Sequence, residues 1–135
     1  MSETLVLDAC ALIAFFNDEP GANIVQDALS SDANSLVAAV NVYEVVYDVF
    51  RTTGKTESAE RALDLISRLS CKIQWRLDPN LMLEAAHYKK TYKMFLADSI
   101  ALGLAKLNQA RLVTSDHHEF DPIDDAGDAQ FLWIR

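Results

Sequence analysis

Four acidic residues stand out because each lies at the end of a predicted strand or near the start of a predicted helix. They are Asp8, Glu44, Asp98 and Asp116, which are separated by 36, 54 and 18 positions. Carboxylates that are brought close together repel one another unless a cation lies between them. Ligand sets made only of oxygen suit the hard cations Mg²⁺ and Mn²⁺, with waters completing the coordination shell. If the fold unites these side chains, they predict a divalent-metal site.

The apolar runs predict strands that alternate with helices along one domain spanning residues 1–135. The predicted strands cover residues 5–7, 36–40, 72–75, 111–114 and 130–134. The predicted helices cover residues 11–16, a segment capped by Asp18 and ending at Leu29, and residues 41–54, 56–69, 78–93 and 98–107, with a polar loop at 30–35. This order predicts an α/β fold with a mainly parallel central sheet of about five strands, flanked by helices.

Ligands of open parallel sheets bind outside the carboxyl ends of the strands. Asp8 and Asp116 directly follow predicted strands, and Glu44 lies one helical turn after another. Asp98 lies near a helix start, where the chain can return to the same edge. We therefore expect the four acids to converge there. Each also has an ordinary explanation: Asp8 could begin a turn, Asn41 and Glu44 could form a capping box, and Asp98 and Asp116 could be helix N-caps.

The segments that contain these acids resemble the four acidic motifs of the PIN domain. The segments are Leu5–Leu12 around Asp8, Val40–Glu44, Leu96–Leu102 around Asp98, and Leu112–Asp116. More narrowly, the chain is similar to the VapC-type ribonuclease toxins of prokaryotic toxin–antitoxin pairs, over its whole length and in motif order and spacing. The resemblance implies a Mg²⁺- or Mn²⁺-dependent endoribonuclease with a metal site at Asp8, Glu44, Asp98 and Asp116. It also implies 5′-phosphate and 3′-hydroxyl products, a cognate antitoxin and a homodimer.

Two positions depart from that family pattern. Cys10 stands where Ser or Asn is frequent, and His118 stands where a further acid is frequent. Asp121 and Asp124 could supply a further metal ligand or could be solvated loop acids. His117 and His118 could act as general acids or could be exposed and incidental.

A metal site of this kind can hydrolyse a phosphodiester without a side-chain nucleophile. The bound ion lowers the pKa of a water, positions the resulting hydroxide for in-line attack, and neutralises charge that develops on the phosphoryl oxygens.

The net charge of −8, from 12 basic and 20 acidic residues, excludes a domain held to nucleic acid by its own net positive charge. A local basic rim of Arg51, Lys89, Lys90 and Lys93 could still contact the RNA backbone, in which case affinity falls with salt; otherwise these residues form a solvated helix face. Asp48 could support the metal site or pair with Arg51 or Thr52 within its helix.

Several other classes of protein are disfavoured. The longest apolar run, Ala9–Phe16, is too short to cross a membrane, and the first residues lack the positive region of a signal peptide, so we expect a cytoplasmic protein. The two cysteines form no zinc pattern. A haloacid-dehalogenase-type enzyme would need an acid at Cys10, and a receiver-like domain would need an Asp after the strand at 72–75. The remaining alternative is a catalytically inactive PIN-fold module that acts by binding a protein or RNA partner.

Overall fold

A computed structural model describes residues 3–30 and 34–135 of the chain. In that part, strands and helices alternate as the apolar pattern predicts. Their order is β1 (Thr4–Leu7), α1 (Ala9–Phe16), α2 (Ala22–Ala28), β2 (Asn34–Ala38), α3 (Ala39–Thr53), α4 (Thr56–Arg68), β3 (Cys71–Gln74), α5 (Pro79–Tyr92), α6 (Leu96–Leu107), β4 (Arg111–Thr114), α7 (His117–Asp125) and β5 (Gln130–Trp133).

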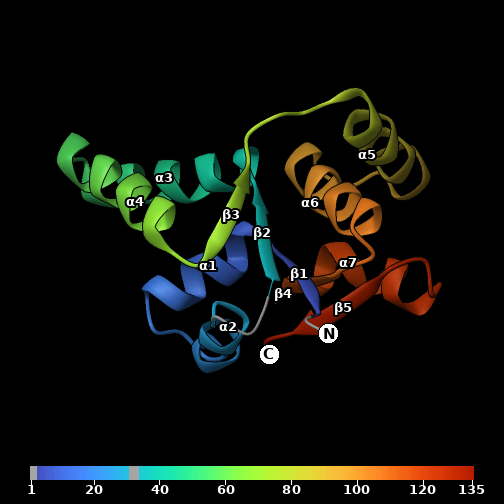
Figure 1. Cartoon of the computed structure of the whole chain (residues 1–135), viewed down its shortest axis with the longest axis horizontal. Coiled ribbons are helices and arrows are strands. Elements are labelled where there is room, and N and C mark those ends of the chain that lie inside the picture. Colours follow the sequence, from blue (N-terminus) through green and yellow to red (C-terminus); the bar gives the residue numbers. More distant parts are fainter. Residues whose placement is uncertain (1–2, 31–33) are drawn as a thin grey trace.

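The strands form one five-stranded sheet in the order β3-β2-β1-β4-β5, and every neighbouring pair is parallel. Successive side chains of a strand point to opposite faces of the sheet. Leu5 and Leu7 therefore pack with α1 to α4, whereas Val6 and Leu112 pack with α5 to α7. Figure 1 shows the two groups of helices on either side of the sheet. The predicted α/β fold with a parallel sheet flanked by helices is confirmed.

Some predicted boundaries are wrong. Asp18 has a φ of +52° and does not cap α2, whose N-cap is Gly21. The strand predicted at 36–40 ends at Ala38, where α3 begins; the first two residues of α3, Ala39 and Val40, are apolar and half-buried, so the apolar run continues through the boundary. In the predicted loop at 30–35, residues 31–33 lie outside the described residues, and Ser35 is a buried part of β2.

The helix α7 was not predicted from the sequence. It starts where the Asp116 carboxylate accepts a hydrogen bond from the Glu119 amide at 3.2 Å, and it contains Pro122. Its apolar residues Phe120 and Ile123 are fully buried. The dense acids and the internal proline made the segment resemble a loop, since a proline inside a helix removes a backbone hydrogen bond.

Gly21 is the position where the backbone leaves least room. Its φ is +96°, and an added Cβ would lie 2.3 Å from the carbonyl oxygen of Ile134, whereas Gly54, with a φ of +68°, faces open space. We expect Gly21→Ala to lower the free energy of unfolding by about 3 kcal/mol, from left-handed strain and overpacking together. Gly54→Ala should lower it by about 1 kcal/mol, from strain alone. Denaturant unfolding measures both, and equal losses would contradict the packing argument.

Candidate active site

The candidate site lies where the strand order of the sheet reverses. The chain runs outward from β1 to β2 and β3, and then crosses back to place β4 on the other side of β1. Crevices at the carboxyl ends of strands on either side of such a reversal are the usual ligand sites of open α/β sheets. Asp8 directly follows β1, and Asp116 follows β4 by two residues, so these two acids flank the reversal point.

Asp8 is held by hydrogen bonds to both of its oxygens. It is only 2% exposed. Its Oδ1 accepts from the Ala11 amide at 2.9 Å as the N-cap of α1, and its Oδ2 accepts from the Thr114 hydroxyl. The Thr114 oxygen in turn accepts from the Asp116 amide at 3.0 Å. Thr114 therefore links the two acids that flank the reversal point.

Asp98 and Glu44 reach the same edge from helices on opposite faces of the sheet. Asp98 lies in the first turn of α6, where the positive end of the helix dipole favours a carboxylate. Glu44 lies in the second turn of α3, and its Oε1 accepts a hydrogen bond from Asn41 Nδ2 at 2.9 Å. The capping-box alternative for Asn41 and Glu44 is wrong, because α3 begins at Ala39 and both residues are inside it.

The four predicted acids lie close enough to influence one another electrostatically. Burial raises the pKa of Asp8 to about 7, against the opposing hydrogen bonds from Thr114 and Ala11, and the charges of Asp116 and Glu44 raise it further. Burial, then the charges of Asp116 and Asp8, raise the pKa of Asp98 to about 7. Burial also raises the pKa of Glu44, against the hydrogen bond from Asn41. The fold thus concentrates negative charge that water does not fully screen.

Glu119 is a further member of the cluster that was not predicted. Its charge contributes to raising the pKa of Asp98, and it occupies the first turn of α7. The sequence signal was present, since an acid three residues after Asp116 is the spacing of a helix start. Asp121 and Asp124 have other partners: Asp121 binds His117, and Asp124 accepts from the Trp133 indole at 3.1 Å.

Cys10 faces the cluster from the first turn of α1. Burial, then the charges of Asp8, Asp116, Asp98 and Glu44, raise the pKa of its thiol to about 12. A thiol with that pKa stays protonated at neutral pH. It therefore adds neither a further negative charge nor a thiolate nucleophile.

The donor chemistry of the cluster fits a hard divalent cation, since all its members offer carboxylate oxygens. Across residues 3–30 and 34–135, no three acidic, histidine or cysteine side chains lie close enough to hold one ion as they stand. Hydrogen bonds from the Ala11 amide and the Thr114 hydroxyl fix the Asp8 carboxylate, so the other acids would have to turn toward it. A shared ion would therefore require side-chain rotations.

His117 is engaged at both ring nitrogens. Its Nδ1 lies 2.8 Å from the Asp121 carboxylate, its Nε2 lies 2.8 Å from the carbonyl oxygen of Arg135, and its ring stacks on Trp133 with centroids 3.8 Å apart. The hydrogen bond to Asp121, followed by that to Arg135, raises the pKa of His117. These contacts tie the start of α7 to the end of the chain, and they leave neither nitrogen free for a general-acid role.

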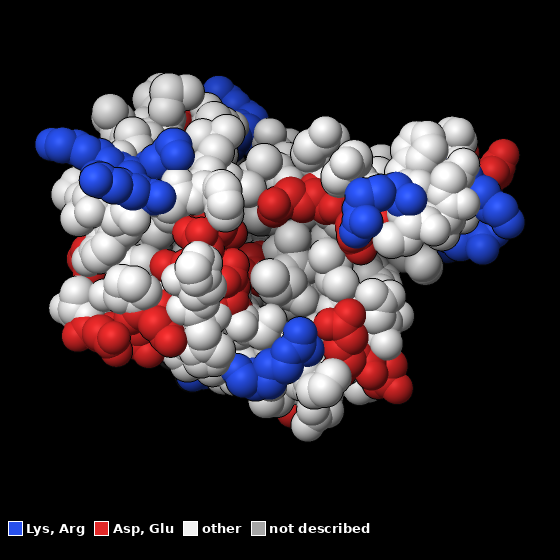
Figure 2. All heavy atoms as spheres, turned by 180° about the vertical axis from the view of Figure 1, so that it is seen from behind, with Lys and Arg blue, Asp and Glu red and all other residues white. Residues whose placement is uncertain are grey.

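Figure 2 shows acidic side chains in the middle of one face, with basic side chains toward its margins. Of the predicted basic rim, Arg51 pairs with Asp48 at 2.6 Å, and Lys89 donates to the Met94 carbonyl at 2.7 Å. Asp48 is thus an intrahelical partner of Arg51. Lys90 and Lys93 are exposed.

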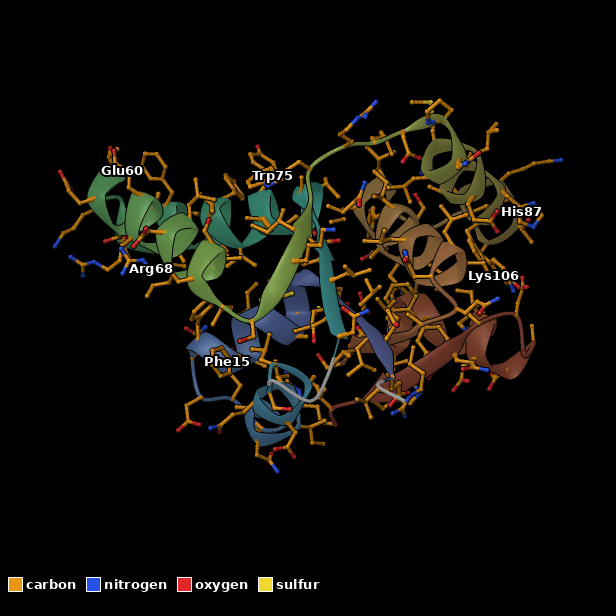
Figure 3. All side chains as sticks on the ribbon, in the orientation of Figure 1. Phe15, Glu60, Arg68, Trp75, His87 and Lys106 are labelled. Atoms are coloured by element: carbon orange, nitrogen blue, oxygen red, sulfur yellow. The ribbon has the colours of Figure 1, made fainter. Side chains whose placement is uncertain are left out.

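Several aromatic residues lie on the surface. Tyr43 is 66% exposed and Trp75 is 63% exposed, and Figure 3 shows Trp75 projecting from the chain just after β3. Trp75, Leu77 and Leu96 line a pocket of about 240 Å³. A second pocket, of about 320 Å³, lies between α1, α3 and α4, where Phe16, Val49 and Leu65 contribute to its lining.

The fold is a parallel α/β domain with acidic residues at the point where the strand order reverses. Both features are typical of one family of domains. The chain belongs to the PIN domain family, whose model matches residues 5–126. No curated protein sequence matches the chain closely enough to count as a relative.

Solved structures share the fold over nearly the whole chain. VapBC-1 from nontypeable Haemophilus influenzae has a TM-score of 0.74 at 19% identity, over 97% of this chain and 98% of that chain. DNA-bound VapBC from Salmonella typhimurium has a TM-score of 0.70 at 16% identity, over all of both chains. The sarcin-ricin-loop-cleaving toxin VapC20 of Mycobacterium tuberculosis has a TM-score of 0.69 at 11% identity, over 96% of this chain and 98% of that chain.

Among the described residues, no helix combines the length and the apolar character needed to cross a membrane.

Proposed function

We propose that this chain is a VapC-type toxin that cleaves RNA in the presence of Mg²⁺ or Mn²⁺ and is neutralised by a cognate antitoxin. The observation that carries the proposal is the convergence of Asp8, Glu44, Asp98 and Asp116, from four separate elements, into a cluster where burial and mutual repulsion raise carboxylate pKa values. Membership of the PIN family and the shared fold with VapBC toxins support it. Because such a toxin acts on cellular RNA, the proposal places the protein in the cytoplasm.

The four acids would hold the cation, which when bound supplies an activated water and neutralises phosphoryl charge. Thr114 keeps the Asp8 carboxylate aimed at the cluster, because its hydroxyl donates to Oδ2. Asp98 adds charge at the start of α6, where the helix dipole stabilises it. Lys90 and Lys93 are exposed and can contact the RNA backbone at the margin.

The deciding experiment measures cleavage of structured RNA by purified protein, with Mg²⁺ or Mn²⁺ and with EDTA. We expect cleavage only with metal, and a loss of at least about 100-fold in Asp98→Asn, because a lost ligand should cost at least as much as a lost supporting residue. Asp64→Asn is the matched control, since Asp64 is an exposed helical acid that pairs with the exposed Arg68. It should cleave like the wild type.

Two other outcomes would count against the proposal. Cleavage that survives both EDTA and Asp98→Asn would point to a contaminant or another site. A folded protein that cleaves no RNA with metal present would favour the inactive PIN-fold binding module. An inactive module has no need to hold repelling carboxylates together, which is why the cluster favours the enzyme.

We propose that the antitoxin binds in the pocket between α1, α3 and α4. Phe16, Val49 and Leu65 give it an apolar lining, and Arg61 adds a positive charge. An apolar groove between helices suits an amphipathic segment that buries one face. The fold is shared with a toxin-antitoxin complex from Klebsiella pneumoniae and with VapBC-1 from nontypeable Haemophilus influenzae, which supports a partner of this kind.

We propose that two copies form a homodimer through a second surface, the apolar face formed by Trp75, Leu77 and Leu96. These side chains are 63%, 46% and 61% exposed, and they surround one pocket. A contiguous apolar patch on a small domain usually marks an interaction site. A second copy that presents the same face would bury both patches in an isologous contact.

A further inference from the structure

Asn41 is a buried residue next to the acidic cluster, and its side chain makes only part of its possible hydrogen bonds. It is fully buried in the first turn of α3, and its Nδ2 donates to Glu44. Its Oδ1 has no hydrogen-bond partner, and no other buried side-chain nitrogen or oxygen in residues 3–30 and 34–135 lacks one. A buried acceptor without a donor destabilises a fold, so the orphan oxygen calls for an explanation.

The orientation of the carboxamide follows from its neighbour. An ionised carboxylate can only accept hydrogen bonds, so Asn41 must turn its NH₂ group toward Glu44. Its carbonyl oxygen then lies on the opposite side of the carboxamide, where no protein group donates to it. A water molecule can supply the missing donor. Waters that accompany a bound Mg²⁺ or Mn²⁺ are strong donors, because the cation polarises them, and Mg²⁺ retains several of them in proteins.

We propose that Asn41 is a positioning residue for a divalent cation at the acidic cluster, with Nδ2 fixing the Glu44 carboxylate and Oδ1 accepting a hydrogen bond from a water of the ion. This inference rests on the proposed metal-dependent function and adds a residue that lies outside the four acids. It also gives the buried oxygen a donor, which no protein group among the described residues provides.

A purely structural Asn41 and a positioning Asn41 predict different results for two substitutions. Asn41→Leu has a similar volume but removes both the donor and the acceptor. Asn41→Asp keeps the acceptor and replaces the donor by a second carboxylate oxygen beside Glu44. If Asn41 were only structural, loss of melting temperature and loss of metal affinity would rise together. If it positions the ion, the two quantities separate.

The experiment titrates Mn²⁺ alone into the full chain by calorimetry and measures melting separately in EDTA. Asn41→Leu should melt within a few degrees of the wild type, because an orphan acceptor is removed along with one bond, and its Kd for Mn²⁺ should rise at least about 10-fold. Asn41→Asp should melt lower in EDTA because it sets a second carboxylate beside Glu44, but it should keep its Kd within about 3-fold of the wild type, because the added negative charge attracts the cation and offsets the lost donor to Glu44. Ser35→Ala is the control, because Ser35 is a buried polar residue of β2 that donates to the Ala28 carbonyl, and it should leave the Kd unchanged.

An unchanged Kd in Asn41→Leu would overturn this inference while leaving the proposed metal site intact. A wild-type chain that binds no Mn²⁺ would overturn both. If Asn41→Leu does not fold, Asn41→Asp carries the test by itself. A Kd raised 10-fold or more in that variant would overturn the role of the acceptor oxygen.

Discussion

Asp8→Asn should abolish RNA cleavage and, in the absence of metal at pH 8, make the fold more stable. The lost carboxylate is the most buried of the four acids, so we expect cleavage to fall by at least about 100-fold. The gain in stability has a separate cause. Burial raises the pKa of Asp8 to about 7 from an ordinary 3.8, so at pH 8 the folded state carries a charge that it disfavours. At about 1.4 kcal/mol for each pKa unit, removal of the charge should raise the free energy of unfolding by about 2–4 kcal/mol.

The sign of the pH dependence follows from the same raised pKa. A carboxyl group whose pKa is higher in the folded state favours folding below its unfolded pKa, and this contribution is lost as the pH rises through the folded value. Wild-type stability in EDTA should therefore fall between pH 5 and pH 8, and it should fall less in Asp8→Asn. Part of the pH dependence remains in the variant, because the pKa of Asp98 is also raised to about 7. Denaturant unfolding at both pH values measures it.

Asp78→Asn is the matched control for Asp8→Asn. Asp78 caps α5 by accepting from the Leu81 amide at 3.0 Å, as Asp8 caps α1 by accepting from the Ala11 amide at 2.9 Å. Asn caps a helix about as well as Asp, so the capping bond is preserved in both variants. Asp78→Asn should therefore change neither cleavage nor stability at pH 8. A stability gain in both variants would mean that the cluster is not its cause.

Leu77→Glu should convert a dimer into a monomer. Leu77 belongs to the apolar face with Trp75 and Leu96, and a carboxylate there would be buried without a partner in an isologous contact. Two-fold symmetry places the added carboxylate of each copy in the interface, so each dimer buries two unpaired charges. We expect the dimer dissociation constant, measured by sedimentation velocity, to rise by at least about 100-fold, which corresponds to about 2.7 kcal/mol.

Leu107→Glu separates a specific interface from a general effect of added charge. Leu107 is 45% exposed, almost the same as the 46% of Leu77, but it lies at the end of α6, away from the pocket that defines the apolar face. It should leave the dissociation constant unchanged. A wild-type chain that sediments as a monomer at high concentration would overturn the dimer proposal. If Leu77→Glu and Leu107→Glu weakened the dimer equally, the interface would not lie at the apolar face.

The order of the elements followed from the sequence because buried parallel strands and amphipathic helices leave clear local patterns. The run Leu5–Leu7 and the Asp that ends it locate β1 without any tertiary information. Where a strand and a helix adjoin within one apolar run, as at Ala38 and Ala39, the run hides the boundary. The segment that forms α7 was missed because its acids and proline mask two buried apolar residues.

The sequence by itself determined the identity and order of the four acids and, through the alternation of strands and helices, the sheet edge at which they converge. Only the tertiary structure decided how they are held. The Thr114 hydroxyl reaches Asp8 across 106 positions, and Glu119 joins the cluster because α7 carries it there. The orphan oxygen of Asn41 likewise depends on which neighbours surround it. Residue types and periodicity are local properties, whereas hydrogen bonds, burial and the repulsion that raises a pKa depend on distances between segments that the chain brings together only when it folds.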